Sequence, residues 1–443
     1  MGSFGSRLFG TDGVRGEANS RLTPDLALAL GRATGEGMNQ GPVLVGRDTR
    51  RSGEMLSLAF QAGLHSVGID TLDVGVLPAG GIAWSTEQTG ATMGAVISAS
   101  HNPAPDNGIK LLDRRGQKLS DLAEGAIERR LGEGPPWRTP IGPLVGTRMP
   151  HDTAAEGYVE FLRQQSTYSL RGVEVALDCA NGAAFAVAPL LFERLKADVR
   201  VFGATPDGTN INEGVGATNP EYLARHAKGR IGLCFDGDAD RLIAVDEDGR
   251  VANGDVIMAI IARHLKTQDK LRQNIIVGTV MANLGFRKAM EELEIEFVAT
   301  QVGDRYVLET MKEIGAGLGG EQSGHVIFLD SAPGGDGLLT AVKLMDVVAS
   351  SGKQLRQLRR EVITEYPQVL KNVRVGNTSG LDDARALWEA VAEAERSMDG
   401  DGRVLVRASG TEPLIRVMVE AATVDTANSI ADQLVAVTER TFR

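Results

Sequence analysis

Three stretches of the chain share one order of hydrophobic and polar positions. Residues 42–75, 173–203 and 274–303 each open and close with a short β-branched apolar run. Between the two runs lie a polar loop and a segment whose apolar residues recur at helical spacing. Continuous apolar strands joined by helices predict parallel strands that are covered on both faces. We therefore expect three related α/β domains with mixed, largely parallel sheets.

The end of the chain follows a different pattern. Residues 402–421 have the pattern of strand, turn and strand, and a helix is expected to begin near Thr423 or Asp425. This predicts a smaller C-terminal α+β domain. A Gly- and Pro-rich stretch at 132–143 and a polar turn before residue 254 indicate boundaries. The predicted domains span residues 1–150, 151–253, 254–367 and 368–443.

Composition narrows the classes of protein that fit this pattern. The 443 residues carry 47 Lys and Arg against 58 Asp and Glu, a net charge of -11, which argues against a nucleic-acid partner. No apolar run approaches the roughly 18 residues of a membrane span, and the N-terminus lacks a signal-peptide core. Cys179 and Cys234 lack the spacing of metal ligands and are expected to be buried thiols. We therefore expect a cytoplasmic protein without a membrane partner.

The segment AVISASHNPAPDNGIKLL, residues 95–112, places a serine where a strand ends. Pro103 stops further strand pairing, so Ser100 lies at a strand–loop junction, the usual position of sites in parallel sheets. His101 and Lys110 accompany it as catalytic candidates. A hydroxyl that only bonds backbone is the simpler alternative. The G-x-S-x-G elbow of acyl-transfer hydrolases is missing.

The segment IGLCFDGDADRLIAVDE, residues 231–247, carries three alternating carboxylates, Asp236, Asp238 and Asp240. Carboxylates this close repel one another unless a hard cation lies among them. Arg241 occupies the sixth position, where an EF-hand needs Gly, and the flanking residues have strand character. We therefore predict a strand–loop–strand Mg²⁺ site with one ion per chain. A solvated acidic turn is the alternative.

Two further loops are suited to a phosphorylated sugar. In GEQSGH, Glu321 and Ser323 could bond vicinal hydroxyls and His325 could move a proton, although a Gly-rich turn is an equal alternative. The nearby G-x-G-x-x-G pattern is no dinucleotide fingerprint, because it follows a helical segment and precedes a strand. RASGTEPLIRV is typical of an anion-binding turn, with a hairpin carrying solvated arginines as the alternative. It contains Arg407, Ser409, Gly410, Thr411 and Arg416.

Smaller Arg-containing segments could add positive charge around one anion. FGTDGVRGE contributes Arg15, and GRDTRRSG contributes Arg47, Arg50 and Arg51. VGDRYV contributes Gly303, Asp304 and Arg305.

The order SASHNP, DGDADR, GEQSGH and RASGTEP resembles the α-D-phosphohexomutase superfamily, from Arg15 to Arg416. FGTDGVRG, ISASHNP and Gln322 within GEQSGH are most similar to members that act on glucosamine phosphates. The resemblance implies four domains around a central cleft. It also implies that glucosamine 6-phosphate and glucosamine 1-phosphate are interconverted, which feeds UDP-N-acetylglucosamine synthesis. Glucosamine 1,6-bisphosphate would be the intermediate and activator.

The resemblance also implies roles for individual residues. Ser100 would carry the phosphoryl group and complete the Mg²⁺ site of Asp236, Asp238 and Asp240. Glu321 and Ser323, with Gly303 and Asp304, would bind the sugar, and the RASGTEP residues would bind its other phosphate. Charge stabilisation and proton transfer would fall to Arg15, His101, Lys110, Arg241 and His325. The segment NINEGVGAT departs from many members, which carry Cys where Val215 stands, and it receives no role.

Other functions remain possible on the sequence alone. A metal-dependent phosphatase would need the acidic loop but no second phosphate site. A non-catalytic protein that binds sugar phosphates would not phosphorylate Ser100. Within the superfamily, glucose or mannose phosphates are the nearest competing substrates. The expected partner is a small sugar phosphate, and a homodimer is allowed.

Overall fold

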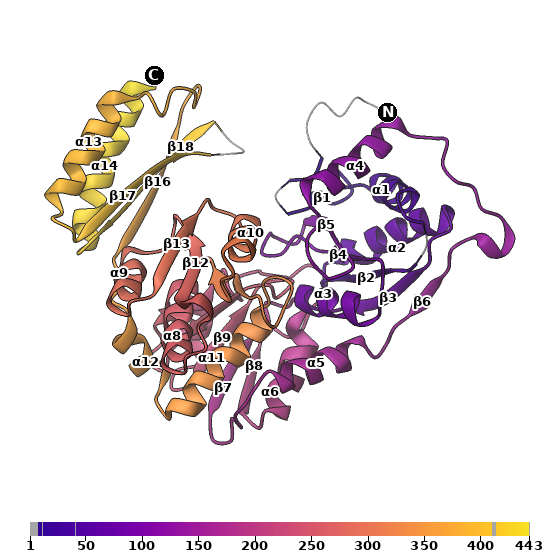
Figure 1. Ribbon diagram of the computed structural model, residues 1–443, viewed down its shortest axis with the longest axis horizontal. Coiled ribbons are helices and arrows are strands. Elements are labelled where there is room, and N and C mark those ends of the chain that lie inside the picture. Colours follow the sequence, from indigo (N-terminus) through magenta and orange to yellow (C-terminus); the bar gives the residue numbers. More distant parts are fainter. Residues whose placement is uncertain (1–7, 11, 40, 410–412, 443) are drawn as a thin grey trace. The chain divides into compact units, whose positions relative to one another are not determined.

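The computed structural model describes residues 8–10, 12–39, 41–409 and 413–442, which belong to two compact units (Figure 1). The larger unit comprises Met1–Val280 and Glu296–Glu361, and the smaller comprises Met281–Ile295 and Val362–Arg443. The larger unit holds three sheets and the smaller unit holds one.

The first sheet is mixed and has the strand order β1-β5-β4-β2-β3-β6. Its strands are β1 (Val14–Glu17), β2 (Val43–Arg47), β3 (Thr71–Val76), β4 (Met93–Ile97), β5 (Asp106–Leu112) and β6 (Arg148–Pro150). Strands β2, β3, β4 and β6 run parallel, while β5 is antiparallel to both β1 and β4. Its helices are α1 (Pro24–Glu36), α2 (Arg51–Ser66), α3 (Ala79–Gln88) and α4 (Asp121–Glu133).

The second sheet has the strand order β11-β10-β9-β7-β8. Its strands are β7 (Glu174–Asp178), β8 (Asp198–Phe202), β9 (Ile231–Phe235), β10 (Leu242–Val245) and β11 (Val251–Ala252). Strands β7, β8 and β9 are parallel, and β10 turns back antiparallel to β9. The helices of this region are α5 (Ala154–Gln164), α6 (Ala184–Arg194) and α7 (Pro220–His226), and α8 (Gly254–Thr267) packs against both this sheet and the third.

The third sheet has the strand order β13-β12-β14-β15. Its strands are β12 (Ile275–Thr279), β13 (Glu296–Thr300), β14 (Leu318–Gly320) and β15 (Val326–Phe328). Strand β12 is parallel to β13 and β14, and β15 closes an antiparallel hairpin with β14. The accompanying helices are α10 (Asp304–Ile314), α11 (Gly337–Ser351) and α12 (Leu355–Val362).

The smaller unit is an antiparallel sheet, β16-β18-β17, with helices packed on it. Its elements are α9 (Leu284–Glu292), β16 (Gln368–Arg374), α13 (Arg385–Ser397), β17 (Gly402–Ala408), β18 (Leu414–Ala421) and α14 (Val424–Thr441). Thr423 caps α14, as the sequence predicts. Helix α9 lies between two strands of the third sheet in the sequence but belongs to this unit.

A buried carboxylate ties α9 to the C-terminal sheet. Glu420, on β18, is 0% exposed, and its Oε2 accepts a hydrogen bond from the backbone N–H of Leu284 at 2.9 Å. Arg403 Nε donates to the same oxygen at 3.0 Å. A carboxylate at a helix N-terminus satisfies unpaired N–H groups and complements the helix dipole.

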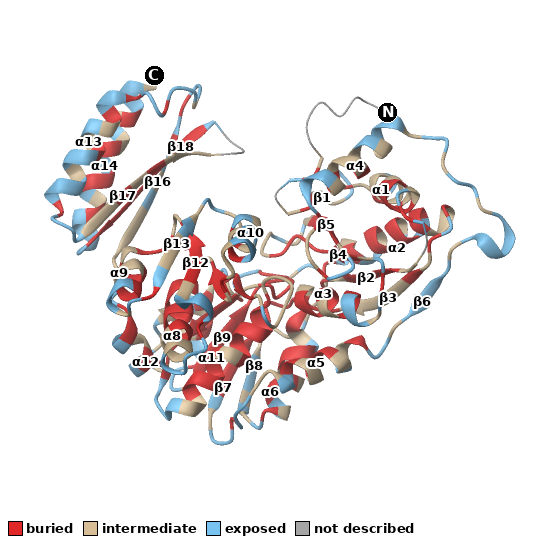
Figure 2. Ribbon diagram, viewed as in Figure 1, coloured by how far each residue is buried: buried red, intermediate tan, exposed pale blue. Residues whose placement is uncertain are grey.

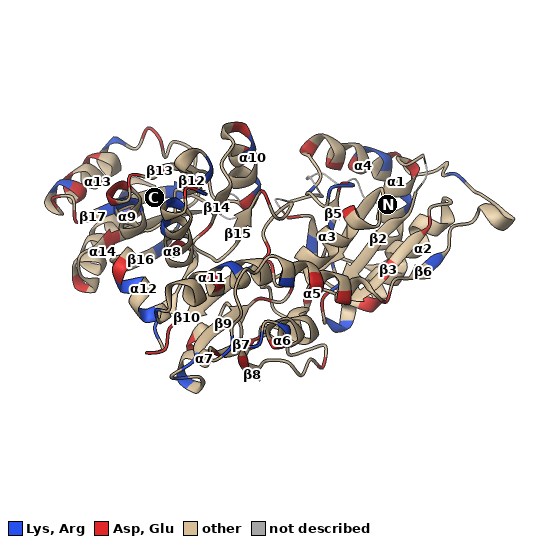
Figure 3. Cartoon of the chain, turned by 60° about the horizontal axis from the view of Figure 1, so that its bottom comes forward, with Lys and Arg blue, Asp and Glu red and all other residues tan. Residues whose placement is uncertain are grey.

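The burial pattern agrees with the apolar runs of the sequence. Strands β9 and β10 and most of α11 are buried, whereas α13 and α14 bury one side only (Figure 2). Acidic and basic residues are interspersed along the helices of both units (Figure 3). No helix within the described ranges is long and apolar enough to cross a membrane. The prediction of three α/β domains with mixed, largely parallel sheets and a C-terminal α+β domain is confirmed.

Candidate active site

Ser100 follows the carboxyl end of β4 in a strained backbone conformation. Its φ is +52°, in the left-handed region that non-glycine residues rarely adopt, and it is 1% exposed. Its Oγ donates a hydrogen bond to Asp236 Oδ2 at 2.6 Å. Its N–H donates to Ser98 Oγ at 2.9 Å, and that hydroxyl donates to Asp48 Oδ2 at 2.6 Å. The hydroxyl predicted to carry phosphate therefore lies directly against the acidic loop.

A buried arginine holds the backbone around Ser100. Arg50 is 1% exposed, pairs with Asp48 at 2.9 Å, and donates to the carbonyl oxygens of Ser100 at 2.9 Å and Asn102 at 2.7 Å. Arg50 therefore brings positive charge close to Ser100, while protein acceptors occupy its guanidinium. Arg305 is likewise bonded to Asp121, Glu124 and the carbonyl of Leu119.

The three predicted aspartates meet in the turn between β9 and β10. The side chains of Asp236, Asp238 and Asp240 are buried, and each offers an oxygen within 4.8 Å of the others. Burial, reinforced by Asp240 and then Asp238, raises the pKa of Asp236 to about 8. Among the described residues, Oδ1 of Asp238 and Oδ1 of Asp240 are buried without a hydrogen-bond partner. Close, mutually repelling carboxylates with unused oxygens suit a hard divalent cation.

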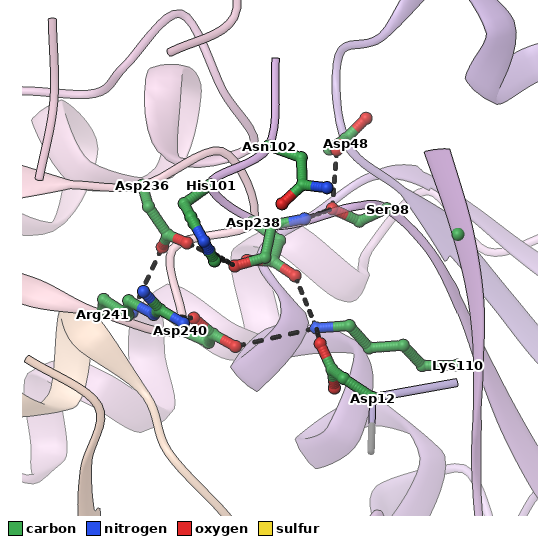
Figure 4. Close-up of polar contacts among 12 residues, drawn as sticks. Asp12, Asp48, Ser98, His101, Asn102, Lys110, Asp236, Asp238, Asp240 and Arg241 are labelled. Carbon is green, nitrogen blue, oxygen red and sulfur yellow. Dashed lines mark hydrogen bonds and ion pairs between the residues drawn. The ribbon is translucent and has the colours of Figure 1, made fainter. Parts of the chain in front are cut away.

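Lys110 supplies the positive charge beside this turn (Figure 4). It comes from β5, and its Nζ lies 3.0 Å from Asp238 Oδ2, 3.0 Å from Asp12 Oδ2 and 3.7 Å from Asp240 Oδ2. Burial alone lowers the pKa of Lys110, but Asp12, Asp238 and Asp240 outweigh burial and raise it above its usual value. Lys110 is therefore a fixed cation between segments that are distant in the sequence.

A second set of charges continues from Asp12 to His325. Lys118 Nζ lies 2.7 Å from Asp12 Oδ1 and also pairs with Asp304. His325 lies between two carboxylates, with Nδ1 3.6 Å from Asp240 Oδ2 and Nε2 3.6 Å from Asp304 Oδ2. Burial alone lowers the pKa of His325, but Asp240 and Asp304 raise it to about 9. Asp12 and Lys118 were not predicted as site residues from the sequence. Proximity to Arg15 and Lys110 was the only sequence signal for them.

The remaining predicted charge-stabilising residues lie around Ser100 and the aspartates. His101 Nδ1 is 3.5 Å from Ser100 Oγ, and burial, aided by Arg241 and Arg15, lowers the pKa of His101 to about 4. Arg241 donates its backbone N–H to Asp236 Oδ1 at 3.2 Å, and its Nε lies 3.8 Å from Asp240 Oδ1. Arg15 pairs with Asp12. All six predicted catalytic residues thus lie in contact with this polar network.

The predicted sugar-binding loop forms the tip of the β14–β15 hairpin. Glu321 is half-buried and accepts the N–H of Gly303 on Oε1 at 3.1 Å, while Ser323 is exposed. This bond joins the two segments expected to bind the sugar. A cavity of about 390 Å³ borders the loop and is lined by Lys110, Lys118, Asp240, Asp304 and His325 among others. Its volume lies within the range of small-molecule sites.

The smaller unit brings two of its predicted phosphate ligands together. Arg407 on β17 pairs in register with Arg416 on β18, and burial and then Arg416 lower the pKa of Arg407. Among the described residues, Arg416 Nε is buried without a hydrogen-bond partner. Ser409 donates its N–H to Leu414 O at 2.9 Å, and the predicted ligands Gly410 and Thr411 lie outside the described residues. Adjacent guanidiniums with unused donors suit a phosphate.

Comparisons with known proteins show the family of the chain. Four domain models of phosphoglucomutase/phosphomannomutase match: domain I at residues 6–135, domain II at 156–249, domain III at 253–366 and the C-terminal domain at 370–437. The phosphoglucosamine mutase of Listeria innocua is 49% identical over 440 residues, covering 97% of this chain and 98% of that protein. The phosphoglucosamine mutase of Bacillus subtilis is 47% identical over 439 residues, with coverage of 97% and 98%.

The fold also matches solved structures. The chain superposes on Aspergillus fumigatus N-acetylphosphoglucosamine mutase, solved in complex with GlcNAc-6P and magnesium, with a TM-score of 0.71. The two are 18% identical, and the match covers 98% of this chain and 96% of that one. Full-length sequence relatives, the four domain models and the shared fold lead to one conclusion. The chain belongs to the phosphoglucomutase/phosphomannomutase superfamily of isomerases, within its group of phosphoglucosamine mutases.

Proposed function

We propose that this chain interconverts glucosamine 6-phosphate and glucosamine 1-phosphate through a phosphoserine at Ser100. The observation that carries the proposal is the 2.6 Å contact between Ser100 Oγ and Asp236 in a buried carboxylate triad. The full-length phosphoglucosamine mutase relatives support the choice of sugar.

The reaction needs two phosphoryl transfers. The phosphoryl group would move from Ser100 Oγ to the hydroxyl oxygen at C1 of glucosamine 6-phosphate. The P–O bond to Oγ breaks as a P–O bond to the C1 oxygen forms, and the proton of the C1 hydroxyl passes to Ser100 Oγ. The resulting glucosamine 1,6-bisphosphate would reorient within the site, so that its 6-phosphate faces Ser100. The 6-phosphoryl group would then transfer to Ser100 Oγ. The P–O bond at the C6 oxygen breaks, the proton of Oγ passes to that oxygen, and glucosamine 1-phosphate leaves with the phosphoserine restored. Such transfers depend on positioning and charge stabilisation.

The acidic triad would hold one Mg²⁺ ion together with the phosphate on Ser100. When bound, the ion would neutralise charge on the oxygens of the transferred group. The chain's own cations would share this work: Lys110 and Arg241 lie beside carboxylates of the triad, and Arg15 pairs with Asp12, which Lys110 also contacts. His325 and His101 are the groups placed to move protons.

The sugar and its second phosphate have separate ligands. Glu321 and Ser323 would bond sugar hydroxyls beside the Gly303–Asp304 turn. Arg407, Ser409, Gly410, Thr411 and Arg416 would bind the phosphate that is not being transferred.

The proposal is tested by comparing turnover of glucosamine, glucose and mannose 6-phosphates, together with labelling of Ser100 by radioactive glucosamine 1,6-bisphosphate. We expect the amino sugar to give the highest kcat/KM and the label to map to Ser100. Release of inorganic phosphate without isomer formation would identify a phosphatase. Absence of both turnover and label would leave only a binding protein.

The Asp238→Asn variant is expected to need about 10- to 100-fold more Mg²⁺ for half-maximal activity, because a charge-assisted ligand is worth roughly 1.5–3 kcal/mol. Magnesium titration of activity measures this. Asp248→Asn is the matched control, since Asp248 pairs with Arg356 outside the triad. An unchanged titration for Asp238→Asn would favour a solvated acidic turn.

The Arg416→Ala variant is expected to lower kcat/KM by about 10- to 100-fold, mainly through KM. The bond to the non-reacting phosphate is present in the enzyme–substrate complex and in the transition state. Its loss therefore weakens the binding of both states equally. Steady-state kinetics with glucosamine 6-phosphate measure the effect. Exposed Arg374 on β16 is the control position. An unchanged KM in a folded variant would remove this loop as the phosphate ligand.

A further inference from the structure

The segment NINEGVGAT, without a role so far, reaches the loop that carries Ser100. Asn212 lies between β8 and α7, and its Nδ2 donates to the carbonyl oxygens of Ser100 at 2.9 Å and Asn102 at 3.1 Å. Arg50 donates to the same two oxygens. A carbonyl oxygen has two lone pairs, so two side chains together fill the acceptor capacity of both carbonyls. Arg50 lies in the loop after β2 of the first sheet, and Asn212 lies in the loop after β8 of the second sheet.

Asn212 is itself firmly placed. It is 8% exposed, its φ is +60°, and its N–H donates to Ala180 O at 2.9 Å. Its Oδ1 is buried without a hydrogen-bond partner among the described residues, so its amide hydrogens are what its side chain contributes. The loop is also anchored at Gly208, whose carbonyl accepts the N–H of Arg51 at 2.8 Å.

The acidic loop lies against the same contact. A Cβ added to Gly237 would come within 2.5 Å of Ser100 O and 2.9 Å of Asn212 Nδ2. Gly237 lies between Asp236 and Asp238 in the sequence. The backbone of the carboxylate turn therefore packs closely against the side-chain amide of Asn212 and the carbonyl oxygen of Ser100. The placement of Ser100 relative to Asp236 therefore depends on groups from both sheets.

We propose that Asn212 is a positioning residue, which fixes the strained backbone of Ser100 against the acidic loop. The proposal rests on the proposed phosphoryl transfer at Ser100. A left-handed φ at a non-glycine residue persists only where surrounding contacts impose it, and the two carbonyl bonds of Asn212 are such contacts. Arg50 remains when Asn212 is removed, so the loop loses half of this support and keeps the other half.

The test compares Asn212→Gly with Asn181→Gly. Glycine adopts positive φ without strain, so both backbones are preserved. Asn181 is matched: it is also 8% exposed with a φ of +50°, but its side chain bonds Asn210 O and the N–H of Thr205. The readouts are kcat and KM for glucosamine 6-phosphate, the rate of Ser100 labelling by glucosamine 1,6-bisphosphate, and the thermal midpoint.

We expect Asn212→Gly to lower kcat and the labelling rate by about 10- to 100-fold with little change in KM, the scale expected when a reacting group is misplaced by about 1 Å. Asn181→Gly should lower neither by more than about 3-fold, with a similar thermal midpoint. Equal losses in both variants would show a general loop effect and overturn the proposal. Unchanged kinetics in Asn212→Gly would overturn it as well.

A second variant, Asn212→Asp, tests the loss of the two amide hydrogen bonds without a change in side-chain volume. Asn212→Asp keeps the side-chain volume but turns oxygens toward the two carbonyls, so its kcat loss should equal or exceed that of Asn212→Gly. Wild-type kcat in Asn212→Asp would contradict the proposal. The wild-type protein reports separately on the proposed function: if it neither isomerises the sugar nor labels at Ser100, that function fails whatever the Asn212 variants do.

Discussion

Replacing Ser100 with alanine is expected to abolish turnover, with a loss of at least about 10⁴-fold in kcat, because the oxygen that carries the phosphoryl group is removed. The fold should survive, since the strained backbone is held through the carbonyls of Ser100 and Asn102 and through Ser98 rather than through Oγ. Steady-state kinetics measure the turnover, and intact-mass analysis measures the phosphoryl label on the protein.

Ser85→Ala is the matched control for Ser100→Ala. Ser85 is equally buried, and its Oγ has no hydrogen-bond partner among the described residues. The control should keep wild-type turnover and the label. Near-normal turnover by the Ser100→Ala protein, or a label at another residue, would contradict the assignment of the nucleophile.

Replacing Lys110 with methionine is expected to destabilise the protein by about 3–5 kcal/mol, because removing one partner leaves buried charges uncompensated. The Lys110 side chain is 5% exposed and contacts Asp12, Asp238 and Asp240. Added Mg²⁺ should recover part of the loss, since a cation bound only by the folded protein stabilises it. Urea unfolding of the variant with and without Mg²⁺ measures both effects.

The control for Lys110→Met is Lys353→Met. Lys353 pairs with Glu361 at 2.7 Å, but its side chain is 43% exposed, and surface pairs are worth about 0–1 kcal/mol. A loss below about 1 kcal/mol in Lys110→Met would mean that the three carboxylates do not depend on this cation.

The sequence was sufficient where a feature is local. The alternating carboxylates, the serine at a strand end and the apolar runs are each short local patterns. The position of Ser100 after a strand, the clustering of Asp236, Asp238 and Asp240, and the α/β repeats could therefore be predicted. The sequence could not show that Asp12, Lys118 and Asp304 form one cluster of charges. Lys118 and Asp304 are 186 positions apart and come into contact only in the folded protein. Charge alone is also insufficient: the sequence shows that Arg50 is a cation, but not that its guanidinium donates to the carbonyl oxygens of Ser100 and Asn102.

The Glu420–Leu284 contact has a consequence for dissecting the chain. The polypeptide passes between the two units at 280/281, 295/296 and 361/362, so no single peptide bond separates them. A fragment ending near residue 361 would carry α9 without the carboxylate that caps it, and a fragment starting there would carry buried Glu420 without the Leu284 N–H that it accepts. Limited proteolysis at the 295/296 connection would cut the chain once, but the two pieces would stay associated because each contributes to both units. Studies of the C-terminal region should therefore use the intact chain.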